Sequence, residues 1–193
     1  MADKYTLKPE DYRDDAKKIG CELAVMLAVF EVESSGKGFY SDGVPKTLFE
    51  GHIFYRQTKG KYAQSHPHLC YKTWTRKWYG KTEAAERARL EEAAKLNRTA
   101  ALMSASWGLP QIMGFNHNLA GYNTLQGFIN AMYRDANSQL ECFTNFILNS
   151  HLDDELRDKR WRDFARLYNG PGQVDIYAPR MEKAYQKFKK QGF

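Results

Sequence analysis

The stretch LAVFEVESSGKGFY, residues 27–40, joins an apolar run to two glutamates, two serines and two glycines. The run covers residues 23–30 and contains no polar side chain. A helix that is apolar on every side lies in the interior of a protein. The stretch therefore predicts a central buried helix that ends at the two glycines, with Glu31 and Glu33 in its last turn.

These two glutamates stand where a carboxylate is hard to stabilise. Burial raises the pKa of a carboxyl group, and the negative end of the helix dipole acts in the same direction. A carboxyl that stays protonated near neutral pH can serve as a general acid. The alternative is that both side chains emerge into solvent as the helix ends, and position alone does not distinguish Glu31 from Glu33.

The rest of the chain is mostly helical by pattern. Pro9 opens a helix that Gly20 ends, and Thr82 caps a helix that runs to about Ser104. One or two helices follow over residues 124–150, another over 152–170, and a last one after them. The expected core residues of the segments 124–150 and 152–170 are Phe128, Met132, Leu140, Phe143, Ile147, Leu152, Leu156, Phe164 and Leu167.

Residues 37–60 differ from this helical background. Asp42 and Gly43 form a hairpin signal, and Pro45 stops a helix. The segment TLFEGHIFYRQT, residues 47–58, fits a short strand or a short helix. Residues 59–82 read as a basic, aromatic loop, and residues 106–122 as a loop with at most one helical turn. We expect a single domain over residues 1–193, mainly helical (α+β), with a small β or irregular lobe.

The composition is that of an ordinary globular protein. Hydrophobic residues make up 42% of the chain and charged residues 27%. The net charge of +6 favours an anionic partner such as nucleic acid, lipid headgroups or an acidic cell wall. No zinc-finger, RNA-recognition or basic-zipper pattern is present, so charge alone supports a nucleic-acid partner.

Neither a metal site nor a cofactor is expected. Cys21, Cys70 and Cys142 are too few and too scattered for a disulfide scaffold. His66 and His68 lie close to Cys70, but a structural zinc site usually has four ligands, so a surface loop is the better interpretation. The polar, acidic start MADKYTLKPEDYRDD lacks the features of a signal peptide, which predicts synthesis in the cytoplasm and assisted exit.

A second candidate carboxylate, Glu50, follows Glu33 by seventeen residues. Glu50, in LFEGHIF, lies on the far side of the predicted small lobe from Glu33. Hydrolysis of a glycosidic bond usually needs two carboxyl groups, roughly 5–9.5 Å apart. A lobe that folds back would place Glu50 across a cleft from Glu33. The alternative is a solvent-facing strand position; Asp42 is a weaker candidate because it reads first as a turn residue.

Two further motifs carry groups that suit a sugar ligand. In SWGLPQIMGF, Gly108 lets backbone approach a ligand, Gln111 both donates and accepts hydrogen bonds, and Trp107 offers a flat face to a pyranose ring. In ARLYNGPG, Tyr168 and Asn169 stand together where a helix ends. The alternatives are a glycine-rich connection with Trp107 in the core, and a plain helix stop.

The motifs together resemble a known family. ES at Glu33 and Ser34, GLPQI at residues 108–112 and LYNGPG at 167–172 resemble the three ordered motifs of goose-type lysozymes and lytic transglycosylases. AVFEVESSGKGF, LFEGHIFYR, SASWGLPQIMGFNH and FARLYNGPG resemble still more closely the single-domain N-acetylmuramidases of phage endolysins. The four motifs run in order from residue 28 to residue 172. Pro110 departs from the transglycosylase pattern, which usually has a longer apolar residue there.

The resemblance implies a lysozyme-like fold, peptidoglycan as substrate and cleavage of the β-1,4 bond between N-acetylmuramic acid and N-acetylglucosamine. It implies Glu33 as the catalytic acid and leaves Glu31 as a structural residue. Glu50 has no counterpart in the transglycosylase motifs, which favours hydrolysis. The residues expected to contact substrate are Ser34, His52, Tyr55, Trp107, Gly108, Gln111, Tyr168 and Asn169. The rivals are a lytic transglycosylase and a non-catalytic wall-binding protein.

The C-terminal segment YAPRMEKAYQKFKKQGF predicts a basic amphipathic helix. Its apolar stripe consists of Tyr177, Met181, Ala184, Tyr185 and Phe188, and its basic residues include Arg180, Lys183, Lys187, Lys189 and Lys190. Such a helix can lie on an anionic membrane or wall. The favoured alternative is a helix docked on the core of a monomer with its lysines in solvent. We expect an enzyme that reaches periplasmic peptidoglycan only after release from the cytoplasm.

Overall fold

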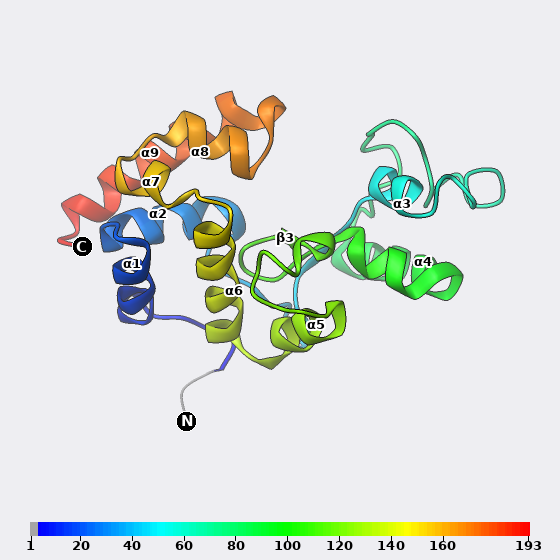
Figure 1. The fold of residues 1–193 in the computed structure, drawn as a ribbon, viewed down its shortest axis with the longest axis horizontal. Coiled ribbons are helices and arrows are strands. Elements are labelled where there is room, and N and C mark those ends of the chain that lie inside the picture. The colour runs from blue at the N-terminus through cyan, green and yellow to red at the C-terminus, as the bar shows by residue number, and fades with distance from the viewer. Residues whose placement is uncertain (1–3) are drawn as a thin grey trace.

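The computed structural model describes residues 4–193, except for the side chain of Ser34 (Figure 1). Helix α2 (Leu23–Ser34) lies at the centre of the helical body, and every residue from Ala24 to Phe30 is buried. The 3₁₀ helix η1 (Pro9–Tyr12) leads into α1 (Arg13–Ile19), and α9 (Val174–Lys190) packs along α2. The predicted central buried helix is therefore confirmed.

Helix α2 ends at Ser34, one residue after Glu33. Ser35 and Gly36 both adopt left-handed backbone, with φ of 54° and 69°. The Ser35 amide donates to the Glu31 carbonyl at 3.1 Å, and the Gly36 amide donates to the Phe30 carbonyl at 3.1 Å. This pair of bonds is the usual closure of a helix by a left-handed residue. It fixes the direction in which the last turn presents Glu33.

A three-stranded antiparallel sheet joins two parts of the molecule. Its order is β1 (Thr47–Phe49), β2 (Ala105–Trp107) and β3 (Ile112–Met113). Thr47 pairs with Trp107, and Ser106 pairs with Met113. The expectation of a loop over residues 106–122 is wrong for its first part, which belongs to the hairpin of β2 and β3. This hairpin also pairs with β1, a strand more than fifty residues earlier in the chain. The expected helical turn is the 3₁₀ helix η2 (Gly114–Asn116).

The sheet opens onto a small lobe, which we define as α3 (Gly51–Gln57), residues 58–82 and α4 (Glu83–Met103). Residues 47–58 thus form both a strand and a helix. Thr82 caps α4 as predicted by accepting a hydrogen bond from the Ala85 amide at 3.2 Å. A kink at Asn97 was not expected; its side chain caps the second half of α4 by accepting from the Ala100 amide at 3.0 Å.

The remaining helices complete a helical lobe, which we define as α1, α2 and α5–α9. Two helices, α5 (Leu125–Arg134) and α6 (Ala136–Asn149), meet at Asp135, whose side chain caps α6. The single helix expected over 152–170 is instead α7 (Asp153–Arg157) and α8 (Trp161–Tyr168), followed by the 3₁₀ helix η3 (Pro171–Gln173). Lys159 separates α7 from α8 with a φ of 56°.

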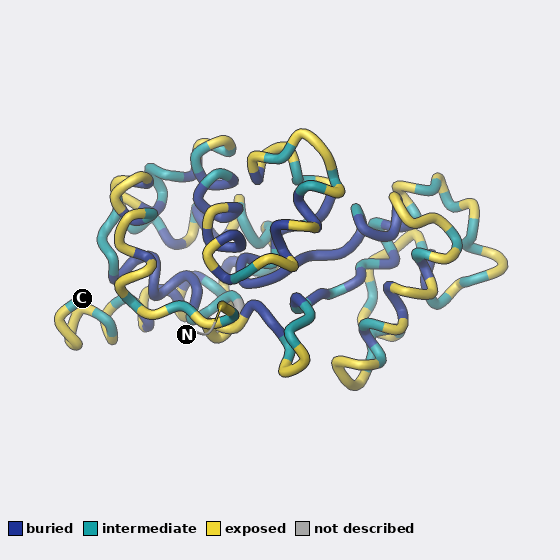
Figure 2. The backbone as a smooth tube through the Cα atoms, turned by 90° about the horizontal axis from the view of Figure 1, so that it is seen from below, coloured by how far each residue is buried: buried dark blue, intermediate teal, exposed yellow. Residues whose placement is uncertain are grey.

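The expected core residues are buried with one exception. Leu167 is 59% exposed because it lies on the outer face of α8, whereas Phe164 of the same helix is fully buried. The buried backbone forms continuous tracts through the helical lobe and along the strands that join the lobes (Figure 2). Figure 1 shows α3 and α4 set apart from the helical lobe, with the sheet between them. Among the described residues, no helix has the length and apolar character to cross a membrane.

The C-terminal helix is docked on the helical lobe. α9 packs against α2 and α8, and Met181 and Ala184 of its apolar stripe are buried. Lys187 pairs with Glu31 at 2.5 Å, and Lys189 pairs with Glu22 at 2.9 Å. The docked alternative therefore describes α9, and two of its lysines already have protein carboxylates as partners. Contact of the exposed Arg180, Lys183 and Lys190 with an anionic surface stays a prediction.

Candidate active site

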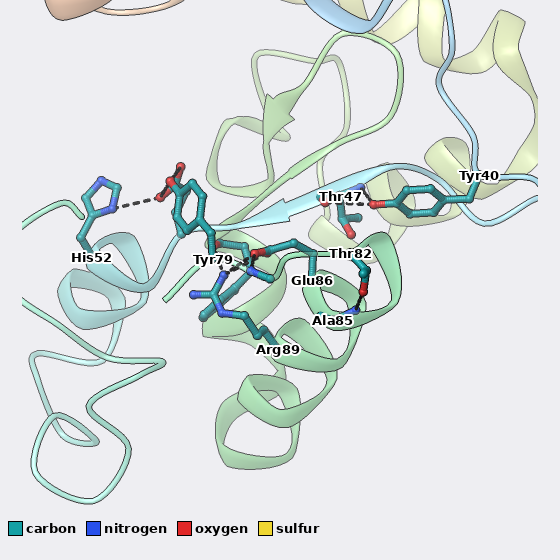
Figure 3. Close-up of polar contacts among 11 residues, drawn as sticks. Tyr40, Thr47, His52, Tyr79, Thr82, Ala85, Glu86 and Arg89 are labelled. Carbon is teal, nitrogen blue, oxygen red and sulfur yellow. Dashed lines mark hydrogen bonds and ion pairs between the residues drawn. The ribbon is translucent and has the colours of Figure 1, made fainter. Parts of the chain in front are cut away.

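A cavity of about 580 Å³ lies between the end of α2 and the small lobe. Glu33 and Gln111 come from the helical side, and Tyr40, Lys46 and Thr47 from the segment that leads to the sheet. The small lobe contributes Gly80, Lys81, Thr82, Glu83 and Glu86. Figure 3 shows Tyr40 and Thr47 facing the start of α4, where Thr82 and Glu86 lie. The cavity thus brings Glu33 to the boundary between the two lobes.

Glu33 is a carboxyl group with a strongly shifted pKa. Burial raises the pKa from 4.5 to about 7, while the hydrogen bond from Asn169 acts in the opposite direction. The Asn169 amide nitrogen Nδ2 donates to Glu33 Oε1 at 2.9 Å. Close to half of such a group is protonated at neutral pH, as a general acid requires. Glu31, two residues earlier, instead points to Lys187 on the outer face.

The end of α8 holds Asn169 against Glu33. The Tyr168 hydroxyl donates to the Pro110 carbonyl at 2.6 Å, and its ring stacks on Phe164 with centroids 5.1 Å apart. Burial raises the pKa of Tyr168, and the nearby charge of Glu33 raises it further. Asn169 Oδ1 is buried and has no hydrogen-bond partner within the described chain. Tyr168 therefore fixes the local backbone, and Asn169 holds Glu33 while its own Oδ1 stays buried without a hydrogen-bond partner in the described chain.

Hydrogen bonds of the Gln111 side chain stabilise the turn between β2 and β3. Gly108 and Gln111 both have positive φ, at 65° and 51°. Gln111 Nε2 donates to the Gly108 carbonyl at 2.8 Å, and Ser106 Oγ donates to Gln111 Oε1 at 2.8 Å. A Cβ atom on Gly108 would lie 2.7 Å from the buried Gln139 side chain. Gly108 is thus explained by packing against the core rather than by close approach to a ligand.

Three other sequence candidates lie away from Glu33. Trp107 is a core residue, 2% exposed, whose indole N–H donates to the Leu102 carbonyl at 3.1 Å, so its face is not presented to a sugar. Tyr55 lies against Gly60 within the small lobe. His52 lies beside Glu50 (Figure 3), with Nδ1 3.2 Å from Glu50 Oε2. The side chain of Ser34 lies outside the described part of the chain.

Glu50 occupies the start of α3 and is held by a tyrosine. The Tyr79 hydroxyl lies 2.7 and 2.8 Å from the two carboxylate oxygens, to which it donates. Burial raises the pKa of Tyr79, and its hydrogen bond to Glu50 raises it further, while a hydrogen bond from Trp74 lowers it. Glu50 does not belong to the lining of the cavity. It lies three residues beyond Thr47, roughly 10 Å along the strand.

Tyr177 of α9 is affected by charges from both lobes. Tyr177 of α9 has its pKa raised by burial and by the charge of Glu33, and lowered by the charges of Arg180 and Arg76. Arg76 belongs to the small lobe and lies over the ring of Trp74, 5.7 Å from its centroid. Trp74 is 50% exposed. Gly80 and Lys81, which directly follow Tyr79, the partner of Glu50, line the same cavity as Glu33.

The sequence prediction missed Tyr79, Tyr40 and Lys46. Tyr40 donates from its hydroxyl to the Thr47 carbonyl at 3.2 Å and accepts from the Thr47 amide at 3.3 Å, which holds the approach to β1. The aromatic and basic residues of the segment 71–81 were visible in the sequence. Nothing in their spacing showed that the Tyr79 hydroxyl reaches Glu50, twenty-nine residues earlier.

Two further glutamates line the cavity, and they differ in whether the carboxylate is free to contact a ligand. Glu86 is buried, and both its oxygens lie 2.9 Å from Arg89; it also accepts from the Gly80 amide. These bonds anchor the segment before α4 and occupy the carboxylate. Glu83 is exposed at the start of α4. Within residues 4–193, no group of three or more His, Cys, Asp or Glu side chains could hold a metal ion.

Comparisons with known proteins agree with this geometry. The family model described as N-acetylmuramidase matches residues 22–189. The chain therefore belongs to the N-acetylmuramidase family, a family of glycoside hydrolases.

A solved structure similar to this chain is the crystal structure of the Burkholderia AP3 phage endolysin. The two share 36% sequence identity with a TM-score of 0.88, and the match covers 100% of this chain and 74% of the other. No curated protein matches the chain.

The pKa of Glu33 predicts a change of stability with pH. Below pH 4.5 the carboxyl is protonated in both folded and unfolded chains. Between pH 4.5 and 7 the unfolded chain releases its proton while the folded chain keeps it, so the free energy of unfolding falls. The loss is at most about 3 kcal/mol, and about 2 kcal/mol after allowance for partial solvent screening. Glu33→Gln should therefore raise Tm at pH 8 by roughly 4–8 °C and leave it nearly unchanged at pH 4.

Thermal unfolding followed by circular dichroism at the two pH values checks this. Glu31→Gln is the matched control, because it changes the same residue type in the same helical turn. It removes only an exposed ion pair with Lys187, which contributes about 0–1 kcal/mol. A Tm at pH 8 that is equal or lower in Glu33→Gln than in the unmodified protein would contradict the raised pKa.

Proposed function

We propose that the protein hydrolyses the β-1,4 bond between N-acetylmuramic acid and N-acetylglucosamine in bacterial peptidoglycan. Membership of the N-acetylmuramidase family supports the substrate class. The single observation that carries the mechanism is Glu33, a carboxyl with a pKa of about 7 at a cavity between two lobes. Its neighbour Asn169 donates one hydrogen bond to it, and the Asn169 Oδ1 has no hydrogen-bond partner in the described chain.

In this proposal Glu33 gives its proton to the glycosidic oxygen as the bond to the muramic acid carbon breaks. The carboxylate that results keeps its hydrogen bond from Asn169 Nδ2, which stabilises the negative charge as it forms. Positive charge develops on the sugar ring, and a water molecule supplies the hydroxyl group that completes hydrolysis. The proton released by that water restores the acid form of Glu33 or passes to solvent.

Glu50 is the proposed second carboxyl group. Tyr79 holds it at the base of the small lobe with His52 beside it, and Gly80 and Lys81, which directly follow Tyr79, line the cavity that contains Glu33. In this position it activates the water or stabilises positive charge on the sugar. Closure of the small lobe over a bound glycan would shorten its distance to the reacting carbon.

Substrate contacts are proposed for the groups that surround these carboxyls. Gln111 lines the cavity, and its side-chain amide is held in the turn between β2 and β3. Asn169 Oδ1, buried and without a hydrogen-bond partner in the described chain, would accept from an acetamido N–H after a shift that exposes it to the cleft. The hydrogen bond from Tyr168 to the Pro110 carbonyl positions both Asn169 and Gln111. Ser34, His52 and Tyr55 stay candidates for sugar contacts further along the cleft. Trp107 is omitted because the core encloses it.

The proposed biological role is that of a phage endolysin, which degrades the host wall at the end of infection. The similarity to the Burkholderia AP3 phage endolysin supports this role. The exposed cations of α9 would assist contact with an anionic wall or membrane. Replacing them would then weaken wall binding without altering cleavage of a soluble glycan.

Mass spectrometry of digested peptidoglycan tests the type of reaction. Hydrolysis should give fragments with reducing muramic acid ends. Fragments with 1,6-anhydro ends, lighter by one water, would instead show a lytic transglycosylase. Intact wall material after prolonged incubation, with the protein still bound to it, would show a non-catalytic wall-binding protein.

A further inference from the structure

A second groove continues the catalytic cavity away from the sheet. Its volume is about 570 Å³. Tyr40, Lys46 and Glu83 line both the groove and the cavity, so the two are contiguous. The groove then runs past Ser35, Gly36 and Lys37, which directly follow the end of α2. A ligand bound at Glu33 would therefore pass Tyr40, Lys46 and Glu83 to extend into it.

The groove carries two cations without protein partners. Lys37 is exposed and Lys46 is half-buried, and neither forms an ion pair with any residue from 4 to 193. The backbone of Lys46 is fixed on both sides, because its amide donates to the Gly38 carbonyl at 2.9 Å and its carbonyl accepts from the Gly108 amide at 2.8 Å. The fold thus fixes the backbone of Lys46 and leaves its ammonium group without an ion-pair partner among residues 4–193.

The neighbouring charges have different roles. Arg87 lies over the Tyr40 ring but pairs with Asp42, so its charge is already matched. Glu83 is exposed at the border between groove and cavity. The groove therefore offers two cations on one stretch and one anion at its junction with the cavity. This pattern fits a ligand that carries both carboxylate and amino groups.

The polysaccharide backbone of peptidoglycan does not have that chemistry. Its N-acetyl sugars are uncharged, because the lactyl carboxyl of muramic acid is converted to an amide by the attached peptide stem. The stem itself carries carboxylates and, in its diamino acid, an amine. Fixed charges opposite such groups give specificity more than affinity.

We propose that this groove binds the peptide stem of the muramic acid next to the cleaved bond. Lys37 and Lys46 contact stem carboxylates, and Glu83 contacts the stem amine. The inference rests on the proposed function, since the stem enters the groove only when the glycan occupies the cavity. It makes the protein selective for glycan that carries stems over the same glycan without them.

The test compares two soluble glycans of equal length, one with its stems and one from which an amidase has removed them and whose freed lactyl carboxyl groups have been converted to uncharged methyl amides. We expect the unmodified protein to have a higher kcat/KM for the stem-bearing glycan. In the double variant Lys37→Gln, Lys46→Gln the ratio of the two kcat/KM values should fall about tenfold, mainly through KM. Lys37→Gln alone should give a smaller fall, and salt should reduce the ratio in the unmodified protein.

Lys95→Gln is the matched control, because Lys95 is exposed on α4 and lies outside both lining sets. It should leave the ratio unchanged. Equal cleavage of the two glycans by the unmodified protein would overturn the inference and leave the hydrolase standing. An unchanged ratio in the folded double variant would do the same, and would indicate that further sugars occupy the groove. Cleavage of neither glycan would overturn the proposed function and this inference with it.

Discussion

Glu33→Gln is expected to lower kcat/KM for purified peptidoglycan by roughly 10²- to 10⁴-fold, the range typical of a lost general acid. Glutamine has nearly the same shape and can keep the hydrogen bond from Asn169, so the cavity is preserved. It cannot give up a proton to the glycosidic oxygen. Turbidity loss of a peptidoglycan suspension measures the rate, and co-sedimentation with the same material should show that binding is retained.

The matched control for activity is again Glu31→Gln. Glu31 lies two residues from Glu33, but its carboxylate pairs with Lys187 on the outer face of the molecule. Its replacement should change the rate less than twofold. If Glu33→Gln kept the full rate, or if Glu31→Gln lost as much, the assignment of the acid would be wrong.

Glu50→Gln is expected to lower kcat/KM by roughly 10²-fold or more, because the reaction then lacks the negative charge that activates water or stabilises the sugar cation. Tyr79→Phe removes the hydroxyl that holds both Glu50 oxygens and should give a smaller fall. The same turbidity assay measures both. The fall in Tyr79→Phe should appear mainly in kcat, since Tyr79 acts on substrate only through Glu50.

Tyr62→Phe serves as the control for Tyr79→Phe. Tyr62 also lies in the small lobe, and its hydroxyl also donates one hydrogen bond, at 2.8 Å to the Leu96 carbonyl. Its replacement should leave the rate near that of the unmodified protein. Full activity in Glu50→Gln would contradict the proposed role and direct attention to Glu83, the exposed glutamate of the cavity lining.

Local signals explain how much of the fold could be predicted. The apolar run before Glu31, the helix end at the glycines that follow Glu33 and the Thr82 cap all act within a few residues, and the structure has a buried helix, a helix end directly before Gly36 and a cap at these places. The missed features depend on distant partners. Strands of two or three residues exist only because β2 pairs with β1, and the kink at Asn97 breaks an otherwise good helical sequence.

The residues of the candidate site also divide into those with local sequence signals and those that depend on distant partners. Glu33 is predicted as the acid from its own segment together with the family motif, and the fold brings the Asn169 amide, from a second motif, to 2.9 Å from it. Trp107 was misjudged because an aromatic residue in a glycine-rich stretch fits a core position and a sugar platform equally well. Tyr79 and Lys46 were missed because their importance comes from what the fold places beside them, Glu50 for one and an open groove for the other.

The central claim is that Glu33 stays protonated into the neutral range and gives its proton to the glycosidic oxygen. The most direct measurement is an NMR titration of the Glu33 side-chain carboxyl carbon, assigned by its absence from Glu33→Gln. We expect a midpoint near pH 7, together with a kcat that declines as pH rises through the same value. A midpoint near 4.5, the ordinary value for glutamate, would contradict it.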